Sequence, residues 1–402
     1  MMIKRLLNIL LILAPLTTAA QDISGTLPIP AMTQKNGNLF SMASEGAKGK
    51  PVLLQPLYWV KTLIDSSAVA TVDRNYIEQP KPSWAIEARY TMNQSTLKME
   101  TTWDNPQTDL SLKSNNGLSK SAGLWLGYRG YGFAYSKEIG RTNGSTFSFG
   151  AMGGSFGINL RISSYGSDMP DLYVDGERVA IFDAEDDRLD DPIKVRTLFL
   201  DGYYMLNGKH FSYAAAYDNS LIQRRSAGSL VVGGMYCHSR TDYSTDSNWL
   251  LSVLMEGVGK MKFTQGSLGA GYAYNWVPAK GWLVSVMAMP MVTLYNRTKE
   301  YLYDTYPHNP NLPDEAWQNL SEEEFAEWLF DDNTTIGMKN ERIEESSNKV
   351  KLNFDARLSV VYNFDRWYLR AYGHYNQFRY GNDVVSGRVT DWTAYASLGF
   401  RF

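Results

Sequence analysis

The chain has 402 residues, a formal net charge of -3 and a single cysteine, Cys237. That length fits one large domain or two ordinary ones, and a lone cysteine excludes an intrachain disulfide framework. The 11 Trp, 26 Tyr, 16 Phe and 33 Gly are typical of strands and tight turns rather than of helix bundles.

Residues 1–20 have the pattern of a secretory signal peptide. Lys4 and Arg5 precede an apolar run at Leu6–Leu16, and small residues precede Gln21. The run is too short for a stable anchor helix, which is the alternative interpretation. No later run of eighteen apolar residues exists, so helical membrane spans are excluded. The mature chain is therefore predicted to start at Gln21 and to be exported.

Residues 21–82 contain no transmembrane pattern and are predicted to form an N-terminal periplasmic extension. The stretch PLYWVKTLI at 56–64 suggests either a short helix or a plug lying in a lumen. The first half of the extension is polar and rich in glycine, so partial disorder is a third reading.

From residue 83 onward, apolar and polar residues alternate with a period of two, which indicates strands. Trp84 and Ile86, for example, alternate with Glu87 and Arg89. The runs reach about ten to thirteen residues, close to the ~9–11 that a tilted strand needs to cross a bilayer. A soluble sandwich would give the same alternation, but the long strands and their aromatic ends favour lipid. The predicted fold is all-β: a transmembrane antiparallel outer-membrane β-barrel over 83–402, with about fourteen strands in a range of twelve to sixteen.

The last strand runs to Phe402, as expected if it pairs with the first strand to close a barrel. Its alternating Leu398, Phe400 and Phe402 also resemble the C-terminal signal that is read by the outer-membrane barrel insertion machinery. The expected partners are therefore that machinery, outer-membrane lipids and lipopolysaccharide, and the expected location is the cell outer membrane.

The connections between strands are of two lengths. Asn207-Gly208 predicts a tight hairpin turn. The connections at 165–193 and 296–348 are long. Barrels of this class have short periplasmic turns and long outer loops, and counting strands back from Phe402 puts both long connections outside.

Both long loops are acidic. Residues 168–191 hold ten acidic residues against two arginines, and 296–348 hold thirteen against four basic residues. A calcium site that bridges to lipopolysaccharide phosphates is one hypothesis. Its ligands would be Asp183, Glu185, Asp186, Asp187, Asp190 and Asp191. The spacing matches no EF-hand, so a solvated, repulsive exterior is the favoured interpretation.

Charged residues also fall on the strand face that is predicted to line the lumen. The candidates are Glu87, Arg89, Lys351, Asp355, Arg357, Arg370, His374 and Arg401. Charged rings in a pore set ion selectivity, whereas a salt-bridged interior would close a narrow barrel. The sequence leaves these two readings open.

Support for catalysis is thin. Some outer-membrane lipid A deacylases and phospholipases use a Ser-His pair on the barrel wall, and His374 with a nearby serine is the fair candidate, followed by His238-Ser239. No G-x-S-x-G, zinc spacing or phosphate loop appears, and no exposed basic stripe suggests nucleic acid. An enzyme is therefore not expected, and no cofactor is implied beyond the calcium hypothesis.

The stretch LNGKHFSYAAAYDNSLIQRRSAGSLVVGG at 206–234, with GLWLGYRGYGFAYS at 123–136, resembles a family of outer-membrane barrels common in Bacteroides-type bacteria, catalogued as domain of unknown function 4421. VDRNYIEQP around Tyr76 also resembles that family's D-T-x-Y-I element, with Arg74 in place of the Thr. The resemblance covers about residues 70–402 and implies a barrel and an exported location, without an activity.

The predicted function is a pore or small-solute channel, or a surface-structural protein. The alternatives are a lipid-modifying hydrolase and a surface protein that binds through its acidic loops. A passive channel needs an open lumen with inward charges that do not neutralise one another. A structural or binding protein would have a plugged lumen.

Overall fold

The computed structural model describes residues 72–402 except 105–106, 116–117, 140–143, 168–170, 175–176, 180–188, 190, 309–320, 322–334, 348–349 and 382–384. The predicted signal peptide and nearly all of the predicted N-terminal extension lie outside these residues. No helix among the described residues has the length and apolar content to span a membrane.

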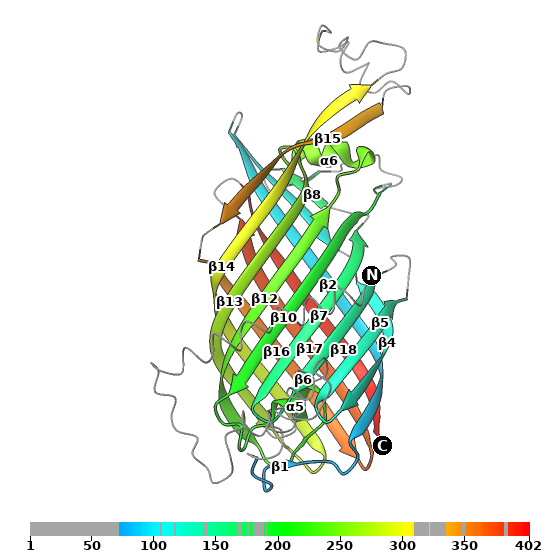
Figure 1. The fold of residues 1–402 in the computed structure, drawn as a ribbon, viewed down its shortest axis with the longest axis vertical. Coiled ribbons are helices and arrows are strands. Elements are labelled where there is room, and N and C mark those ends of the chain that lie inside the picture. The colour runs from blue at the N-terminus through cyan, green and yellow to red at the C-terminus, as the bar shows by residue number, and fades with distance from the viewer. Residues whose placement is uncertain are drawn as a thin grey trace, which may run out of the picture. The chain divides into compact units, whose positions relative to one another are not determined.

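Within the described residues, twelve antiparallel strands form a closed barrel, in which β18 pairs with β2 (Figure 1). The wall strands are β2 (Trp84–Asp104), β4 (Ser119–Tyr128), β5 (Tyr131–Glu138), β6 (Ser145–Met152), β7 (Phe156–Ser167), β10 (Ile193–Met205), β12 (Ala227–Asp242), β13 (Val258–Trp276), β14 (Trp282–His308), β16 (Leu352–Phe364), β17 (Trp367–Gly381) and β18 (Val385–Arg401). The predicted closure of the last strand onto the first is confirmed.

The wall has two strands fewer than the fourteen expected and lies at the lower end of the predicted range of twelve to sixteen. Four further described strands of the same sheet lie outside the wall: β3 (Gln107–Asn115), β8 (Asp171–Val174), β9 (Glu177–Val179) and β15 (Thr335–Ser347). β3 pairs with residues 96–104 of β2, whereas the wall neighbour β4 pairs with residues 84–93. In the same way, β15 pairs with residues 297–308 of β14, whereas the wall neighbour β16 pairs with residues 282–292. β3 alternates like a wall strand, so the pattern alone does not exclude it from the barrel. β15 lies within the connection that was predicted at 296–348.

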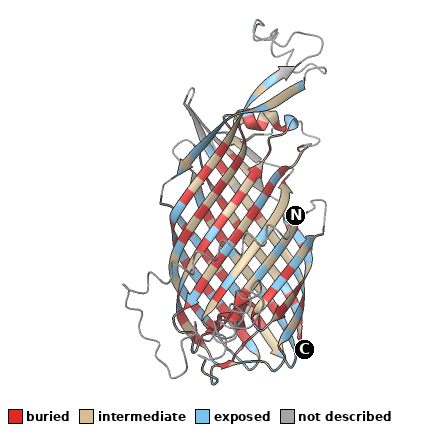
Figure 2. Cartoon of the chain, in the orientation of Figure 1, coloured by how far each residue is buried: buried red, intermediate tan, exposed pale blue. Residues whose placement is uncertain are grey.

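Alternation along each strand separates an outer face from an inner one (Figure 2). On β13, Leu268, Tyr272 and Trp276 are each more than half exposed, while Ala273 and Asn275 are fully buried. The same contrast recurs around the barrel, so its outside is a continuous apolar surface and its interior is filled by side chains.

We call the barrel end that holds Phe402 the near end, and the opposite end, with β15 and the short helix α6 (Trp249–Leu254), the distal end (Figure 1). Near-end connections are mostly short: residues 129–130 join β4 to β5, and 365–366 join β16 to β17. The connections that contain the two acidic stretches both lie at the distal end, on the same side as each other.

One near-end connection breaks this rule. The hairpin predicted at Asn207-Gly208 is wrong, because 206–226 separate β10 from β12 and fold into the barrel mouth. This segment, which we call the plug, contains α5 (Tyr213–Tyr217), whose residues are all buried, and β11 (Ile222–Gln223). β11 pairs with β1 (Ile77–Glu78), which precedes the barrel. Figure 2 shows buried residues gathered around α5.

The interior differs from one side to the other. Met and Phe side chains from β10, β12, β13, β14 and β17 form a packed apolar core. Phe199 on β10 stacks on Phe378 on β17 with ring centroids 5.3 Å apart, so the core bridges the lumen. In contrast, the inward positions of β4, β5 and β6 are mostly small: Ser121, Gly123, Gly132, Ala134, Ser136, Thr146, Ser148 and Gly150. Space therefore remains along that wall.

Candidate functional site

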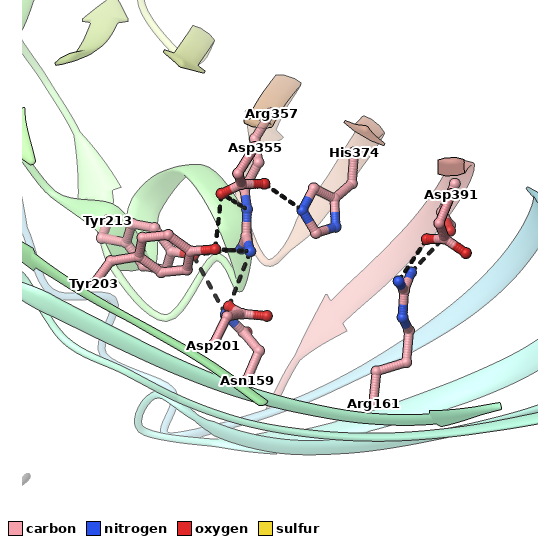
Figure 3. Close-up of polar contacts among 10 residues, drawn as sticks. Asn159, Arg161, Asp201, Tyr203, Tyr213, Asp355, Arg357, His374 and Asp391 are labelled. Atoms are coloured by element: carbon pink, nitrogen blue, oxygen red, sulfur yellow. Dashed lines mark hydrogen bonds and ion pairs between the residues drawn. The ribbon is translucent and has the colours of Figure 1, made fainter. Parts of the chain in front are cut away.

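The centre of the lumen holds an arginine that is surrounded by carboxylates and phenols (Figure 3). Arg357 on β16 donates to Asp201 Oδ2 at 2.9 Å, to the Tyr203 hydroxyl at 2.7 Å and to the Tyr213 hydroxyl at 2.6 Å. Tyr203 in turn donates to Asp355 Oδ2 at 2.7 Å. Since Tyr213 belongs to α5, this cluster ties the plug to two opposite parts of the wall.

His374 on β17 is the histidine that the sequence singled out for catalysis. Its Nε2 lies 2.6 Å from Asp355 Oδ1, and the ring is nearly buried. Among the described residues, no serine hydroxyl is hydrogen-bonded to it. His238 lies on the outer face of β12 and bonds Thr264, whereas Ser239 is buried on the inner face. Neither candidate therefore forms a Ser-His pair.

A second ion pair crosses the lumen between β7 and β18. Arg161 Nη2 lies 2.5 Å from Asp391 Oδ1, and its Nη1 donates to Thr393 Oγ1 at 3.0 Å. Ser95 on β2 donates to the other oxygen of Asp391 at 2.5 Å. Both oxygens of this carboxylate are thus satisfied, which is the condition for holding it in a buried position.

A third cluster lies toward the near end. Arg370 Nη2 lies within hydrogen-bond distance of both Glu87 oxygens, at 2.6 and 2.7 Å, and Arg89 Nε adds a contact at 2.8 Å. The Tyr368 hydroxyl donates to the same carboxylate at 2.8 Å. Arg401 donates to the carbonyl oxygen of Asn219 at 3.1 Å and so reaches the plug.

These three clusters, which we call the lumen network, contain five arginines and four carboxylates: Arg89, Arg161, Arg357, Arg370 and Arg401 with Glu87, Asp201, Asp355 and Asp391. Each of the four carboxylates and each arginine except Arg401 has an opposite partner within hydrogen-bond or ion-pair distance. The charges of these pairs balance, and Arg401, which among the described residues donates hydrogen bonds only to the oxygens of Asn219 and Asn363, adds one positive charge.

The plug has its own anchors. Gln223 Oε1 accepts hydrogen bonds from the Ser212 backbone at 2.9 Å and from Asn275 of β13 at 3.1 Å. Ser212 caps α5 by accepting from the Ala215 amide at 3.0 Å. The Tyr213 ring lies flat against β7 at Gly157, where an added Cβ would fall 2.0 Å from the ring. Docking of the plug therefore requires a glycine at position 157.

A cavity of about 160 Å³ lies between the plug and the wall made by β2, β4–β7 and β18. Tyr217 and Asp218 border it from the plug, and hydroxyl side chains of β4, β5 and β6 border it from the wall. A smaller cavity toward the near end shares Trp125 and Asp218 with it. These two residues therefore stand between the two spaces.

Asp218 is an unusual feature of the plug. It is 3% exposed, and Oδ1 accepts hydrogen bonds from the Ser220 amide at 2.8 Å and hydroxyl at 2.6 Å. No partner among the described residues reaches Oδ2. Burial outweighs these hydrogen bonds and nearby Arg370, and raises the pKa of Asp218 to about 6.

The structure locates most of the residues that were predicted to be functional. Seven of the eight lumen candidates lie in or beside the lumen network; Lys351 is half-buried just before β16 and outside it. Leu398 and Phe402 are exposed on the outer face, where Phe400 and Phe402 stack with centroids 6.3 Å apart.

The calcium hypothesis falls largely outside the described residues. Asp183, Glu185, Asp186, Asp187 and Asp190 are not described, and Asp191 accepts a hydrogen bond from Ser247 at 3.0 Å. In the part of the chain that the structure describes, no group of three or more His, Cys, Asp or Glu side chains could hold a metal.

Sequence reasoning missed several members of the site. Asp391 shares the inward face of β18 with Arg401, so the same alternation could have identified it. Asp201 was hidden because its face of β10 is mostly apolar, with Val195 and Phe199. The plug residues had no signal, because α5 is a five-residue helix between strands.

The chain belongs to the family described as Domain of unknown function (DUF4421), whose model matches residues 71–402. No match was found among curated proteins. This agrees with the resemblance carried by the plug and the β4–β5 hairpin.

Solved barrels show weak likeness. The beta domain of the Bordetella autotransporter Brka is 13% identical, covers 80% of this chain and 100% of its own, and has a TM-score of 0.30. The outer membrane protease OmpT from Escherichia coli is 8% identical, and the match covers 80% of this chain and 98% of the protease with a TM-score of 0.34. The P. putida toluene transporter TodX is 6% identical, with 80% and 91% covered and a TM-score of 0.27. Scores of this size carry no argument about function.

Proposed function

We propose that the protein is an integral outer-membrane barrel, exported by the signal at residues 1–20, that acts as a narrow small-solute channel. Its apolar outer surface supports a lipid environment, because soluble proteins rarely expose apolar patches of such extent. Lipids and lipopolysaccharide would contact this surface, and the strand ending at Phe402 would be read by the insertion machinery.

The observation that carries the channel is the polar cavity beside the plug. A wide or ion-selective pore has no support, because all lumen-network charges except that of Arg401 are paired with opposite charges and the plug occupies the near-end mouth. What the geometry favours is passage of small uncharged solutes along the β4–β6 wall, with the plug limiting their size. A purely structural barrel would share the closed lumen but would pass no solute.

Swelling of liposomes that contain the purified protein tests this proposal. Small neutral polyols should enter, and larger sugars should not. Ser148→Trp places an indole in the cavity and should slow swelling at least fivefold. Phe147→Trp is the matched control, because Phe147 is adjacent to Ser148 in the chain but its side chain faces outward and is 39% exposed. Equal swelling of both variants, or none with the unaltered protein, would contradict the proposal.

A further inference from the structure

The cavity beside the plug has the chemistry of a binding site. We propose that it binds one neutral polyhydroxylated molecule of about the size of a six-membered ring, such as a monosaccharide or a cyclitol. This inference rests on the proposed channel and names its solute class.

The first argument is size. The cavity measures about 160 Å³. An apolar protein cavity of about 150 Å³ holds one benzene molecule, so a single six-membered ring fits and a disaccharide does not. The space exists because β4–β6 present small side chains inward. Trp125, the large exception, lies flat over Gly127 and Gly132, where an added Cβ would meet its ring at 1.9 and 2.3 Å.

The second argument is the hydroxyl lining. Ser121, Ser136, Thr146, Ser148 and Ser163 all border the cavity. None of the five makes a side-chain hydrogen bond to another described residue, so each can donate to and accept from a ligand. The hydroxyl groups of a polyol also donate and accept hydrogen bonds, so they match this lining. Aromatic rings, among them Tyr217 and Tyr372, border the same space and suit the C–H face of a sugar ring.

The third argument is charge. The arginines that border the cavity are already paired with carboxylates, as Arg161 is with Asp391 and Arg357 with Asp201. Among the described cavity residues, one buried carboxylate oxygen has no hydrogen-bond partner, Oδ2 of Asp218 at the edge of the cavity. The Nε of Arg357 also lacks a hydrogen bond, but it lies 3.6 Å from Asp355 Oδ2. A carboxylate oxygen repels an anionic ligand and accepts a hydrogen bond from a hydroxyl. Phosphorylated or carboxylated solutes are therefore disfavoured, and a neutral hydroxyl donor is favoured.

Isothermal titration of the full-length protein in detergent tests the inference, with D-glucose, myo-inositol and glucose 6-phosphate as probes. We expect saturable binding of at least one neutral probe and no binding of the phosphorylated one. Thr146→Val should weaken that binding about fivefold, and Asp218→Asn about tenfold, as the loss of one neutral and one charged hydrogen bond implies. Thr197→Val is the matched control: Thr197 also faces inward, but it bonds Ser239 and does not border the cavity.

No binding of either neutral probe would overturn the inference, as would preference for glucose 6-phosphate or equal losses in Thr146→Val and Thr197→Val. The outcome is separable from the channel proposal. Neutral binding without liposome swelling would retain the site and reject the channel, whereas swelling without binding would retain the channel and reject the site.

Discussion

Arg370 in the barrel wall donates a hydrogen bond to the backbone carbonyl oxygen of Tyr217, the last residue of α5 in the plug. The same guanidinium is paired with both oxygens of Glu87 on β2, the strand that closes the barrel against β18. One side chain thus connects the plug to the closing seam, so the closed lumen and the closed wall depend on a shared set of contacts.

Replacing this arginine should therefore be costly. Arg370→Met leaves the Glu87 carboxylate buried with a single arginine partner, and we expect a loss of about 3 kcal/mol in the free energy of unfolding. Urea denaturation in detergent micelles measures it. The double variant Glu87→Gln with Arg370→Met should lose less than the sum of the two single variants. Strict additivity would mean that the pair is not energetically coupled.

Docking of the plug depends on the absence of a side chain at one position of β7. Gly157→Ala inserts a methyl group into the Tyr213 ring, so α5 should be displaced and stability should fall by about 1–3 kcal/mol. Hydrogen exchange of the amides at 213–217 should accelerate. Gly150→Ala is the control, because its Cβ would meet nothing closer than the flexible Met152 side chain at 3.4 Å. Comparable acceleration in both variants would refute this role for Gly157.

Stability should also depend on pH through Glu300. The outer face of β14 changes from exposed Leu294 to the charged Arg297 and Lys299 before Glu300, which therefore lies beyond the apolar belt. Burial, reinforced by Glu344 opposite it, raises the pKa of Glu300 to about 7.

The folded state thus holds this proton more tightly than the unfolded state, where the pKa is near 4.5. Stability should fall as the pH rises from about 4.5 to 7. Across that range, the urea midpoint should depend less steeply on pH in Glu300→Gln than in the unaltered protein. An unchanged slope in the variant would show that another group is responsible.

The affinity of the cavity for its neutral ligand should follow the ionisation of Asp218. Its pKa is raised to about 6 by burial, despite the Ser220 hydrogen bonds and nearby Arg370, with Glu87 adding to the rise. The strong acceptor is the carboxylate, so binding should weaken as the pH falls through 6 and should be pH-independent in Asp218→Asn. Titration calorimetry at pH 5 and pH 8 compares the two. Identical pH dependence in both proteins would remove Asp218 from the site.

Alternation in the sequence predicted the wall and its closure because lipid and lumen impose opposite polarity on successive residues. It overcounted the strands partly because β3 continues the alternation of β2 while it extends a hairpin above the wall. β15 was missed instead, because it lies within the connection predicted at 296–348. It also misjudged the connection at Asn207-Gly208. That dipeptide is a strong hairpin signal, but the backbone continues into a docked segment that is held to the wall by long-range contacts, such as those of Tyr213 with Arg357 and of Gln223 with Asn275.

The lumen was only partly predictable for a related reason. Inward charges could be identified on β2, β16 and β17, where the opposite face is apolar. Toward the distal end of β10 the polarity of the two faces is reversed. The charged Lys194 and Arg196 are exposed, whereas the apolar Val195 and Phe199 are buried in the packed core. The pairing of charges across the barrel, such as Arg161 with Asp391, is set by the closure geometry and has no local sequence signal.

The central claim is that the plug narrows the lumen to a small path beside it, and single-channel conductance in a planar bilayer tests it most directly. Deleting residues 209–227 would leave Gly208 and Gly228 as a two-residue turn between Asn207 and Ser229, where the strand ends already meet through the Asn207 amide and Ser229 hydroxyl at 3.0 Å. The account predicts a very small conductance for the full-length protein and a several-fold larger, steady conductance for the deletion variant. Equal conductance of the two proteins, with the variant folded as a barrel, would contradict it.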